Sequence, residues 1–323
     1  MAKIQKSNGK TTITLDENRP LKILQLTDIH LGGGLFSRKK DKMALQAVRK
    51  IINHANADMV VVTGDICYPF FIFSGTNNNM KGSKMFADVM EELGVPWCMV
   101  FGNHDVEKHS RFSKEDLSDF YESLPNCLFR RGEPMTGQGN YSIPVFNSDG
   151  SLSMVLMFLD SNSYLSWHFF SGFDTIHQDQ IDWYKREITS LSENGSLAKS
   201  LAFFHIPPKE FKEGWDKCRM GSSEATYHLG FVQEKDNYFG YPKTAEGNFV
   251  KEMQEFGSMK GFFCGHDHLN TLSIDYLGMR MTYGMSIDYL AYRGIKKKTT
   301  QRGGTLITLF PDSSFEVTHL PLE

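Results

Sequence analysis

Five apolar segments of the sequence are each followed at once by side chains that bind metals or transfer protons. The segments read KILQLT (22–27), MVVVTG (59–64), WCMVFG (97–102), LAFF (201–204) and GFFCG (261–265). The polar residues that follow are Asp28 and His30, then Asp65, Asn103 and His104, His205, and finally His266 and His268. Near-continuous apolar runs are typical of strands buried on both faces of a sheet, and ligands of open α/β sheets bind beyond the carboxyl ends of the strands. The pattern therefore predicts one polar site at that edge of a sheet.

The chemistry of these side chains favours a pair of metal ions. Carboxylate, imidazole and amide oxygen, without a thiolate, suit borderline or hard metals such as manganese, iron or zinc. Seven candidate ligands are too many for one tetrahedral site, but they suit two ions about 3.5–4 Å apart that share a carboxylate. Residues i and i+2 of a strand point the same way, so Asp28 with His30, and His266 with His268, each form a potential pincer. Two such ions can hold a hydroxide and neutralise charge during an in-line displacement at phosphorus.

Segments with helical periodicity alternate with the strands. In residues 38–55 the apolar side chains recur at helical spacing, and four further segments read similarly: 83–94, 114–124, 178–193 and 246–256. Alternating strands and helices indicate an α/β layered fold. From 270 to 319 the helices stop and short strands with glycine turns follow, so we expect a mixed architecture in which a second sheet completes the domain.

We expect a single domain over 1–323, with an N-terminal extension at 1–20. Three long stretches, 66–82, 162–177 and 206–245, carry no clear periodicity and are predicted to be irregular, lid-like insertions. Four residues of the last stretch could contact a substrate but are interpreted as part of a solvated loop: Tyr227, His228, Glu234 and Asn237.

Composition excludes several classes of protein. The hydrophobic fraction is 40% and the charged fraction 23%, as in ordinary globular chains, and no apolar run reaches the ~18 residues of a membrane span. The formal charge is −3, so the chain lacks the excess of positive charge that is typical of nucleic-acid-binding proteins. The one basic run, Lys296, Lys297 and Lys298, is interpreted as a solvated loop.

Cysteine usage points to a reducing compartment. There are five cysteines, an odd number, and no pair has the CxxC spacing of a zinc ribbon or a redox motif. The N-terminal MAKIQKSNGK lacks the apolar stretch of a secretory signal. We therefore expect a cytoplasmic protein with reduced thiols.

The ordered set of motifs resembles the calcineurin-like metallophosphoesterase superfamily over residues 22–268. The motifs are Thr27-Asp28-Ile29-His30, Gly64-Asp65, Gly102-Asn103-His104-Asp105, His205 and Gly265-His266-Asp267-His268. Further elements resemble the purple-acid-phosphatase-like branch that includes the yeast Dcr-type and plant class III enzymes: Gly139-Asn140-Tyr141, Leu159-Asp160-Ser161, Asp179-Gln180, Trp183 and Arg302-Gly303-Gly304. The resemblance implies a four-layer α/β/β/α sandwich with two mixed sheets and a metal site at the carboxyl ends of the strands.

The resemblance also assigns the ligands of two metal ions, divalent or trivalent, with iron, manganese and zinc as candidates. It assigns one metal to Asp28, His30, Asp65 and His268. It assigns the other to Asp65, Asn103, His205 and His266, so that Asp65 bridges the pair. Catalytic roles fall to His104, which would stabilise phosphoryl oxygens or protonate the leaving alkoxide, and to Asp105, which would orient His104 or cap the following turn.

Tyr68 departs from the family pattern in an informative way. It follows Asp65 at the spacing with which purple enzymes supply a tyrosinate to ferric iron. Those enzymes have D-x-G in the first motif, whereas this chain has Asp28-Ile29-His30. With His30 present, Tyr68 is not required as a ligand, and both its ligation and the identity of the metal stay open.

The function implied by the resemblance is hydrolysis of a phosphomonoester by a metal-bridging hydroxide with in-line attack. The substrate would be a phosphorylated small molecule or a phosphoprotein. Two alternatives stay open: a phosphodiesterase acting on nucleotides or lipid head groups, and a non-catalytic metal-binding scaffold that recruits a protein partner. Against the scaffold, no ligand position is degraded and His104 is present.

Overall fold

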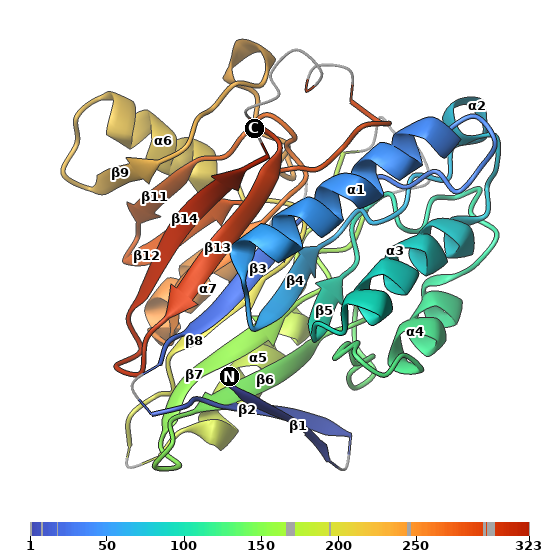
Figure 1. Ribbon diagram of the computed structural model, residues 1–323. Helices are drawn as coiled ribbons and strands as arrows, with labels where there is room; N and C mark the ends of the chain where they lie inside the picture. The colour runs from blue at the N-terminus through green and yellow to red at the C-terminus, as the bar shows by residue number, and fades with distance from the viewer. Residues whose placement is uncertain are drawn as a thin grey trace.

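Two mixed β-sheets pack against each other and carry helices on their outer faces (Figure 1). The structure is a computed structural model, and it describes residues 2–7, 9–17, 19–165, 172–193, 195–243, 247–292, 295 and 301–322. The α/β/β/α arrangement with two mixed sheets expected from the sequence is confirmed.

The smaller sheet has the strand order β14-β13-β3-β4-β5. Its strands are β3 (Leu21–Leu26), β4 (Met59–Thr63), β5 (Trp97–Val100), β13 (Gly303–Leu309) and β14 (Phe315–Pro321). β3, β4 and β5 are parallel, and β13 pairs antiparallel with both β3 and β14. Every residue of β4 is buried, which explains why this strand reads as an unbroken apolar run.

The larger sheet has the order β1-β2-β6-β7-β8-β10-β12-β11-β9. Its strands are β1 (Lys3–Ser7), β2 (Lys10–Thr14), β6 (Tyr141–Phe146), β7 (Leu152–Phe158), β8 (Ser200–Phe203), β9 (Ala225–Leu229), β10 (Met259–Cys264), β11 (Ser273–Tyr276) and β12 (Met279–Tyr283). The central strands β7, β8, β10 and β12 are parallel. The residues predicted as an N-terminal extension supply β1 and β2, which continue the sheet past β6.

The side chains of β7 point alternately to the two faces of the larger sheet and so contribute to two hydrophobic cores. Met154, Leu156 and Phe158 belong to the core between the sheets, whereas Val155 and Met157 belong to the core under the outer helices. Successive side chains of a strand point to opposite faces, so one strand contributes to both cores. The helices on this outer face are α5 (Gln178–Leu191), α6 (Glu210–Arg219) and α7 (Phe249–Phe256).

The other outer layer contains α1 (Arg38–Ala55), α3 (Asn79–Leu93) and α4 (Lys114–Glu122). α1 buries one stripe that includes Ala44, Val48 and Ile51, and it ends at Asn56, which adopts the left-handed conformation of a C-cap. The helices expected from periodicity are confirmed, with ends that differ by a few residues.

Two of the three predicted irregular insertions contain regular elements, so that part of the prediction is wrong. Residues 66–82 contain the short helix α2 (Phe71–Ser74) and the start of α3, and residues 206–245 contain α6, β9 and the 3₁₀ turn Lys235–Asn237. β9 is recognisable only through its pairing with β11, about 50 residues further along the chain, where Ala225 pairs with Tyr276. Residues 166–171 of the insertion 162–177, residues 244–246 of 206–245, and the basic run at 296–298 lie outside the described residues.

No helix among the described residues is both long enough and apolar enough to cross a bilayer. The cysteines are free thiols, and four of the five are buried.

Candidate metal centre

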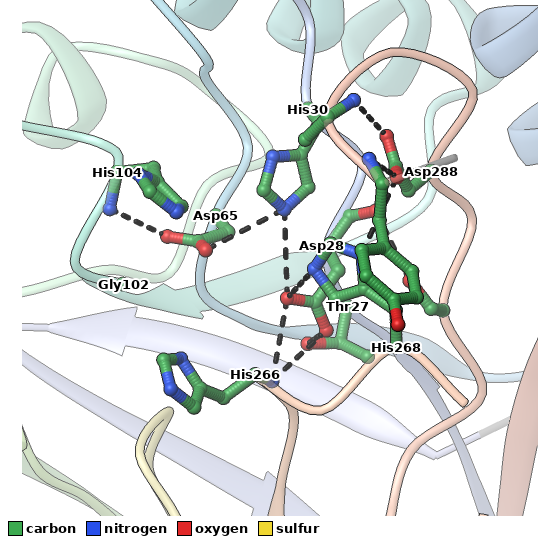
Figure 2. A network of polar contacts seen from close by, with 12 residues as sticks. Thr27, Asp28, His30, Asp65, Gly102, His104, His266, His268 and Asp288 are labelled. Atoms are coloured by element: carbon green, nitrogen blue, oxygen red, sulfur yellow. Dashed lines mark hydrogen bonds and ion pairs between the residues drawn. The ribbon is translucent and has the colours of Figure 1, made fainter. Parts of the chain in front are cut away.

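The carboxyl ends of strands from both sheets meet at one place. β3, β4 and β5 bring Asp28, Asp65 and Asn103 from the smaller sheet, while β8 and β10 bring His205 and His266 from the larger one. Backbone hydrogen bonds tie the loops together: Asp28 N–H donates to Gly64 O (3.2 Å), and Gly265 N–H donates to His205 O (3.1 Å). The side chains of Asp28, His30 and Asp65 converge between these loops (Figure 2).

The backbone is held in an unfavourable conformation at four of the predicted ligands. Asp28, His30, Asp65 and His266 have φ of 50°, 55°, 54° and 76°. They are four of the ten non-glycine residues with positive φ in the described part of the chain. Strain of this kind costs about 1–3 kcal/mol per residue and is concentrated at functional sites. The pincer of Asp28 and His30 therefore arises from left-handed turns beyond the end of β3, not from strand alternation.

One group of ligand atoms gathers around Asp28. Its Oδ1 lies 3.6 Å from His30 Nε2 and 3.4 Å from His268 Nε2. Potential ligand atoms of all three residues lie within 4.8 Å of one another. Two ligands bound to one ion at about 2.1 Å and near-tetrahedral angles lie about 3.4 Å apart. The spacing therefore suits one shared cation.

A second group gathers around His205. Its Nε2 lies 3.2 Å from Asp65 Oδ2, 3.1 Å from Asn103 Oδ1 and 3.4 Å from His266 Nδ1. Asp65 Oδ2 also lies 3.5 Å from His30 Nε2, so this one oxygen faces both groups. The other oxygen of Asp65 accepts a hydrogen bond from the His104 backbone (2.8 Å), which fixes the carboxylate (Figure 2).

Unsatisfied buried atoms show that the donor set fits a metal pair. Within the described part of the chain, both ring nitrogens of His30 and Asp65 Oδ2 are buried without a hydrogen-bond partner. Buried polar atoms are normally hydrogen-bonded, and leaving one unpaired costs about 1–3 kcal/mol. His30 Nε2 and Asp65 Oδ2 face one another at 3.5 Å, at the separation of two ligands on a common ion. Carboxylate and imidazole donors without sulfur suit zinc, manganese or iron.

Contacts behind the ligands select which ring nitrogens point inward. His205 Nδ1 lies 2.7 Å from the carbonyl of Thr63, so Nδ1 carries a proton and Nε2 is the ring nitrogen that faces the site. His268 Nδ1 lies 3.3 Å from Asp288 Oδ2, and its Nε2 faces Asp28. A carboxylate behind a histidine ligand fixes the ring and raises its basicity.

The charges of the site stabilise one another. Burial opposes ionisation of Asp65, but the neighbouring His205 and His104 hold its pKa below the usual range. Burial and the charge of His205 lower the pKa of His266 to about 3, so His266 is neutral, which is the form that ligates metals. Burial opposes the charged form of Asp288 too, yet His268 and His30 lower the pKa of Asp288 to about 2.

Two glycines make room for the ligands. A Cβ on Gly102 would lie 2.2 Å from Asp65 Oδ1, and a Cβ on Gly265 would lie 1.9 Å from Thr27 Oγ1 and 2.8 Å from Asp28 Oδ2. Real Cβ atoms do not come this close to other atoms, so any larger residue at either position would displace a carboxylate.

His104 lies beside the ligands with its ring held from behind. Its Nδ1 lies 2.5 Å from Glu107 Oε1, and its ring is 5.4 Å from that of His30 between centroids. Burial opposes the charged form, but Asp65 and the bond to Glu107 raise the pKa of His104. Glu107 is a site residue that the sequence analysis missed, although its spacing of three residues in a turn after His104 was a usable signal.

Asp105 is buried and bonds to backbone amides. Its carboxylate accepts hydrogen bonds from Asp65 N (3.0 Å), Gly102 N (2.8 Å) and Cys67 N (2.9 Å). These bonds join the loop after β4 to the loop after β5. Asp105 is thus placed to hold the loops that carry Asp65 and Asn103.

Tyr164 and Tyr68 flank the ligands. Asn103 Nδ2 donates to Tyr164 Oη (3.0 Å), which turns Asn103 Oδ1 toward His205. The ring of Tyr68 lies 5.3 Å from that of His30 and 5.1 Å from that of His104. Burial, with added repulsion from nearby acids, raises the pKa of Tyr68 to about 12.

A cavity of about 510 Å³ opens over the centre. Its walls include Tyr68, His104, His266 and His268, together with Glu234 from the stretch interpreted as a solvated loop. The carboxylate of Glu234 is fixed in place, because it accepts hydrogen bonds from Leu269 N (3.0 Å) and Tyr292 Oη (2.8 Å). The interpretation of Glu234 as part of a solvated loop is therefore wrong.

The family model for calcineurin-like phosphoesterases matches residues 21–270. The chain belongs to this family. The match covers the strands β3 to β10 and all seven predicted ligands.

Similar proteins support the purple-acid-phosphatase-like branch. The chain is 27% identical to "Probable inactive purple acid phosphatase 29" of Arabidopsis thaliana, over 85% of this chain and 74% of that protein. It is 29% identical to "Phosphatase DCR2" of Saccharomyces cerevisiae, over 79% of this chain and 45% of that protein. A crystal structure of a dimetal phosphatase from Danio rerio has the same fold, with a TM-score of 0.58 at 12% identity over 94% of this chain and 96% of that one.

Proposed function

We propose that the protein is a dinuclear-metal phosphoesterase that hydrolyses phosphomonoesters. The observation that carries this proposal is the convergence of the predicted ligands around one oxygen of Asp65, which lies 3.5 Å from His30 Nε2 and 3.2 Å from His205 Nε2. The substrate would be a phosphorylated small molecule or a phosphoprotein.

The groups of ligand atoms support two ion sites that share Asp65. One ion would be held by Asp28, His30, Asp65 and His268. The other would be held by Asp65, Asn103, His205 and His266. When bound, two such ions supply Lewis-acid polarisation of the phosphoryl oxygens and lower the pKa of water.

The chain's own residues would position the substrate and supply a proton. His104 lines the cavity, and because Glu107 engages Nδ1, Nε2 is the ring nitrogen that remains for the leaving group. A positioned histidine of this kind contributes general-acid catalysis. Burial of the ligands keeps bulk water away from the carboxylates and strengthens their electrostatic interactions.

The names of similar proteins do not decide between catalysis and a scaffold role. Several are named as probable inactive phosphatases, whereas DCR2 and the Danio rerio protein are named as phosphatases. Two features of the site support catalysis. In this chain all seven ligand positions carry residues able to bind a metal, and His104 is held by Glu107 beside them. A scaffold would need neither the held histidine nor the cavity in front of it.

The test is metal-dependent hydrolysis of p-nitrophenyl phosphate compared with bis(p-nitrophenyl) phosphate. We expect the monoester to be hydrolysed faster, with activity abolished by a chelator and restored by manganese, zinc or iron. Asp65→Ala and Asn103→Ala should each lower kcat by more than about 100-fold, since removing even outer-shell partners of a metal costs about 10–100-fold. Asp275→Asn, in an exposed pair with His228, is the matched control and should leave kcat unchanged.

Three outcomes would count against the proposal. Activity that survives both metal removal and the substitutions would place hydrolysis elsewhere. Faster turnover of the diester would favour the phosphodiesterase alternative. A folded, metal-loaded protein without turnover of either ester would favour the scaffold.

A further inference from the structure

Five large apolar side chains are exposed together next to the mouth of the metal centre. They come from the loop before α1 and from α2, and we call them the apolar tip: Leu35 (77% exposed), Phe36 (64%), Phe71 (67%), Ile72 (83%) and Phe73 (46%). Isolated exposed apolar residues are ordinary, but a contiguous group of this size marks a contact surface.

The two segments of the apolar tip are fastened to each other. Phe36 N–H donates to Ser74 O (3.1 Å), and a Cβ on Gly75 would lie 3.1 Å from the ring of Phe36. Ser74 is buried, and its hydroxyl donates to Phe70 O (2.8 Å). α2 is thus fixed next to one end of α1 (Figure 1). The backbone that carries the tip is held in place by these hydrogen bonds.

Positive charge predominates in the two segments that carry the apolar tip. Residues 31–43 and 70–84, which contain the tip, hold six basic residues and one acidic residue, although the whole chain carries −3. The acid is Asp41, which is buried and accepts hydrogen bonds from Gly32 N (2.9 Å), Gly33 N (3.1 Å) and Ser37 Oγ (2.7 Å). The exposed charges of these two segments are therefore all basic, a feature that the sequence analysis missed because it singled out only the run at 296–298.

Three of these cations follow the exposed Leu35 and Phe36 closely in the sequence. Arg38, Lys39 and Lys42 are exposed on the first turns of α1, immediately after Leu35 and Phe36. Positive charge at a helix N-terminus opposes the helix dipole, so these residues do not stabilise α1 there. Their placement suits an anionic partner.

The apolar tip is also continuous with the catalytic mouth. Phe73 lies 6.0 Å and Phe70 4.7 Å from the ring of Tyr68, between ring centroids. Phe70 in turn lies 5.7 Å from the ring of His104. A surface bound by the tip would therefore lie at the rim of the cavity over the metal centre.

We propose that the apolar tip and its surrounding cations dock the protein onto an anionic lipid bilayer. Leucine, phenylalanine and isoleucine side chains insert into the boundary between head groups and acyl chains, while flanking lysine and arginine contact anionic head groups. A second copy of the chain is a poorer occupant, because a two-fold contact through the tip would bring the same cations together. This inference does not rest on the proposed hydrolysis, because docking is measured without turnover.

The test is co-sedimentation of the full chain with vesicles of phosphatidylcholine alone, and with vesicles of phosphatidylcholine and phosphatidylserine. We expect binding to the mixed vesicles that weakens with added salt, and weaker binding to phosphatidylcholine alone. Phe71→Ser with Ile72→Ser should lower the partition coefficient at least about tenfold, since each removes an apolar side chain that would be buried in the bilayer on docking. Arg38→Ser with Lys39→Ser should lower it about tenfold or more on the mixed vesicles only.

Matched controls come from exposed residues elsewhere on the molecule. Met220→Ser removes an apolar side chain that is 80% exposed at the end of α6, and Lys3→Ser with Lys10→Ser removes two exposed cations of β1 and β2. Both should leave vesicle binding unchanged. Thermal unfolding of each variant checks that the fold is retained.

Three results would overturn the inference. The native chain could fail to sediment with either vesicle. The controls could lower binding as much as the tip variants do. Sedimentation equilibrium could instead show a dimer that Phe71→Ser with Ile72→Ser dissociates, in which case the tip is a self-association surface.

Discussion

The carboxylate of Asp288 lies directly behind His268, with Oδ2 3.3 Å from Nδ1 of the ring, while Nε2 of the same ring faces Asp28 at 3.4 Å. Both oxygens of Asp288 are also anchored, since they accept hydrogen bonds from the backbone of Leu290 (2.7 Å), Ala291 (2.8 Å) and Tyr292 (2.6 Å). The loop after β12 therefore sets the direction of a ligand that comes from the loop after β10.

Asp288→Asn is predicted to weaken metal binding about 10–100-fold, as is typical for loss of a carboxylate behind a histidine ligand. The amide keeps the size of the side chain and one oxygen for the backbone bonds, but it removes the charge that orients His268. Isothermal titration calorimetry with manganese or zinc measures the effect. Asp275→Asn is the control, and an unchanged affinity in Asp288→Asn would show that Asp288 does not position the ligand.

Tyr164→Phe is predicted to act through Asn103. Loss of the hydroxyl removes the acceptor that holds Asn103 Nδ2 at 3.0 Å, so the amide can rotate its oxygen away from His205. Affinity for the metal should fall about tenfold, within the range for outer-shell partners. Tyr227→Phe removes an exposed hydroxyl that donates to Gly230 O and should have no such effect. Equal affinities for the native chain and Tyr164→Phe would contradict this account.

The sequence could predict which side chains come together because chain order alone places them at strand ends. Apolar runs locate the strands, and the carboxyl ends of parallel strands gather at one edge, so Asp65 and His205 could be expected at one site without coordinates. Tyr164 and Asp288 could not be found this way. Tyr164 contacts a residue 61 positions away, and Asp288 contacts His268 across a separate strand pair, so their roles exist only in the folded chain.

The fold, like the site, has parts that the sequence could predict and parts that it could not. Helix α1 was predictable over its full length because its stripe of buried residues is local. The strand β9 was missed because a five-residue strand on an edge, with three of its residues exposed, has no local signature. Its existence depends on hydrogen bonds to β11 that the sequence pattern does not reveal.

Gly102→Ala is predicted to damage the centre although it replaces no predicted ligand. The added methyl would lie 2.2 Å from Asp65 Oδ1 and 2.4 Å from Asp65 N, and both groups are fixed by hydrogen bonds. Metal binding should fall at least tenfold, and the free energy of unfolding should fall by roughly 1–3 kcal/mol as the loop shifts. At Gly150 nothing lies within 4 Å, but φ is 86°, so Gly150→Ala strains the backbone without a clash and should leave metal binding intact.

Stability is predicted to depend on the ionisation of His319 in β14. Burial lowers the pKa of His319 to about 4, against an ordinary value near 6.5, so the folded protein holds this ring neutral. Between pH 6.5 and 4 the ring is protonated in the unfolded chain but not in the folded one. The free energy of unfolding is therefore not reduced by His319 above about pH 6.5, and it falls as the pH drops toward 4, by up to about 1.4 kcal/mol per pH unit. Urea unfolding across this range should show a weaker pH dependence for His319→Gln than for the native chain. The exposed His109→Gln should match the native chain, and parallel curves for all three proteins would show that His319 makes no such contribution.

Metal loading is predicted to stabilise the fold through Asp65. The loops after β3, β4, β5, β8 and β10 carry the predicted ligands, and four of these residues sit in left-handed backbone that the folded chain must hold under strain. An ion that binds only the folded state at a hundredfold excess over its dissociation constant adds about 2.7 kcal/mol, which is several degrees in Tm for a chain of this size. Differential scanning calorimetry with chelator, and then with manganese or zinc restored, measures the shift. Asp65→Ala should abolish the shift because its Oδ2 faces both groups of ligands, whereas Asp275→Asn should retain it. A shift of full size in Asp65→Ala would mean that the stabilising ion binds outside this centre.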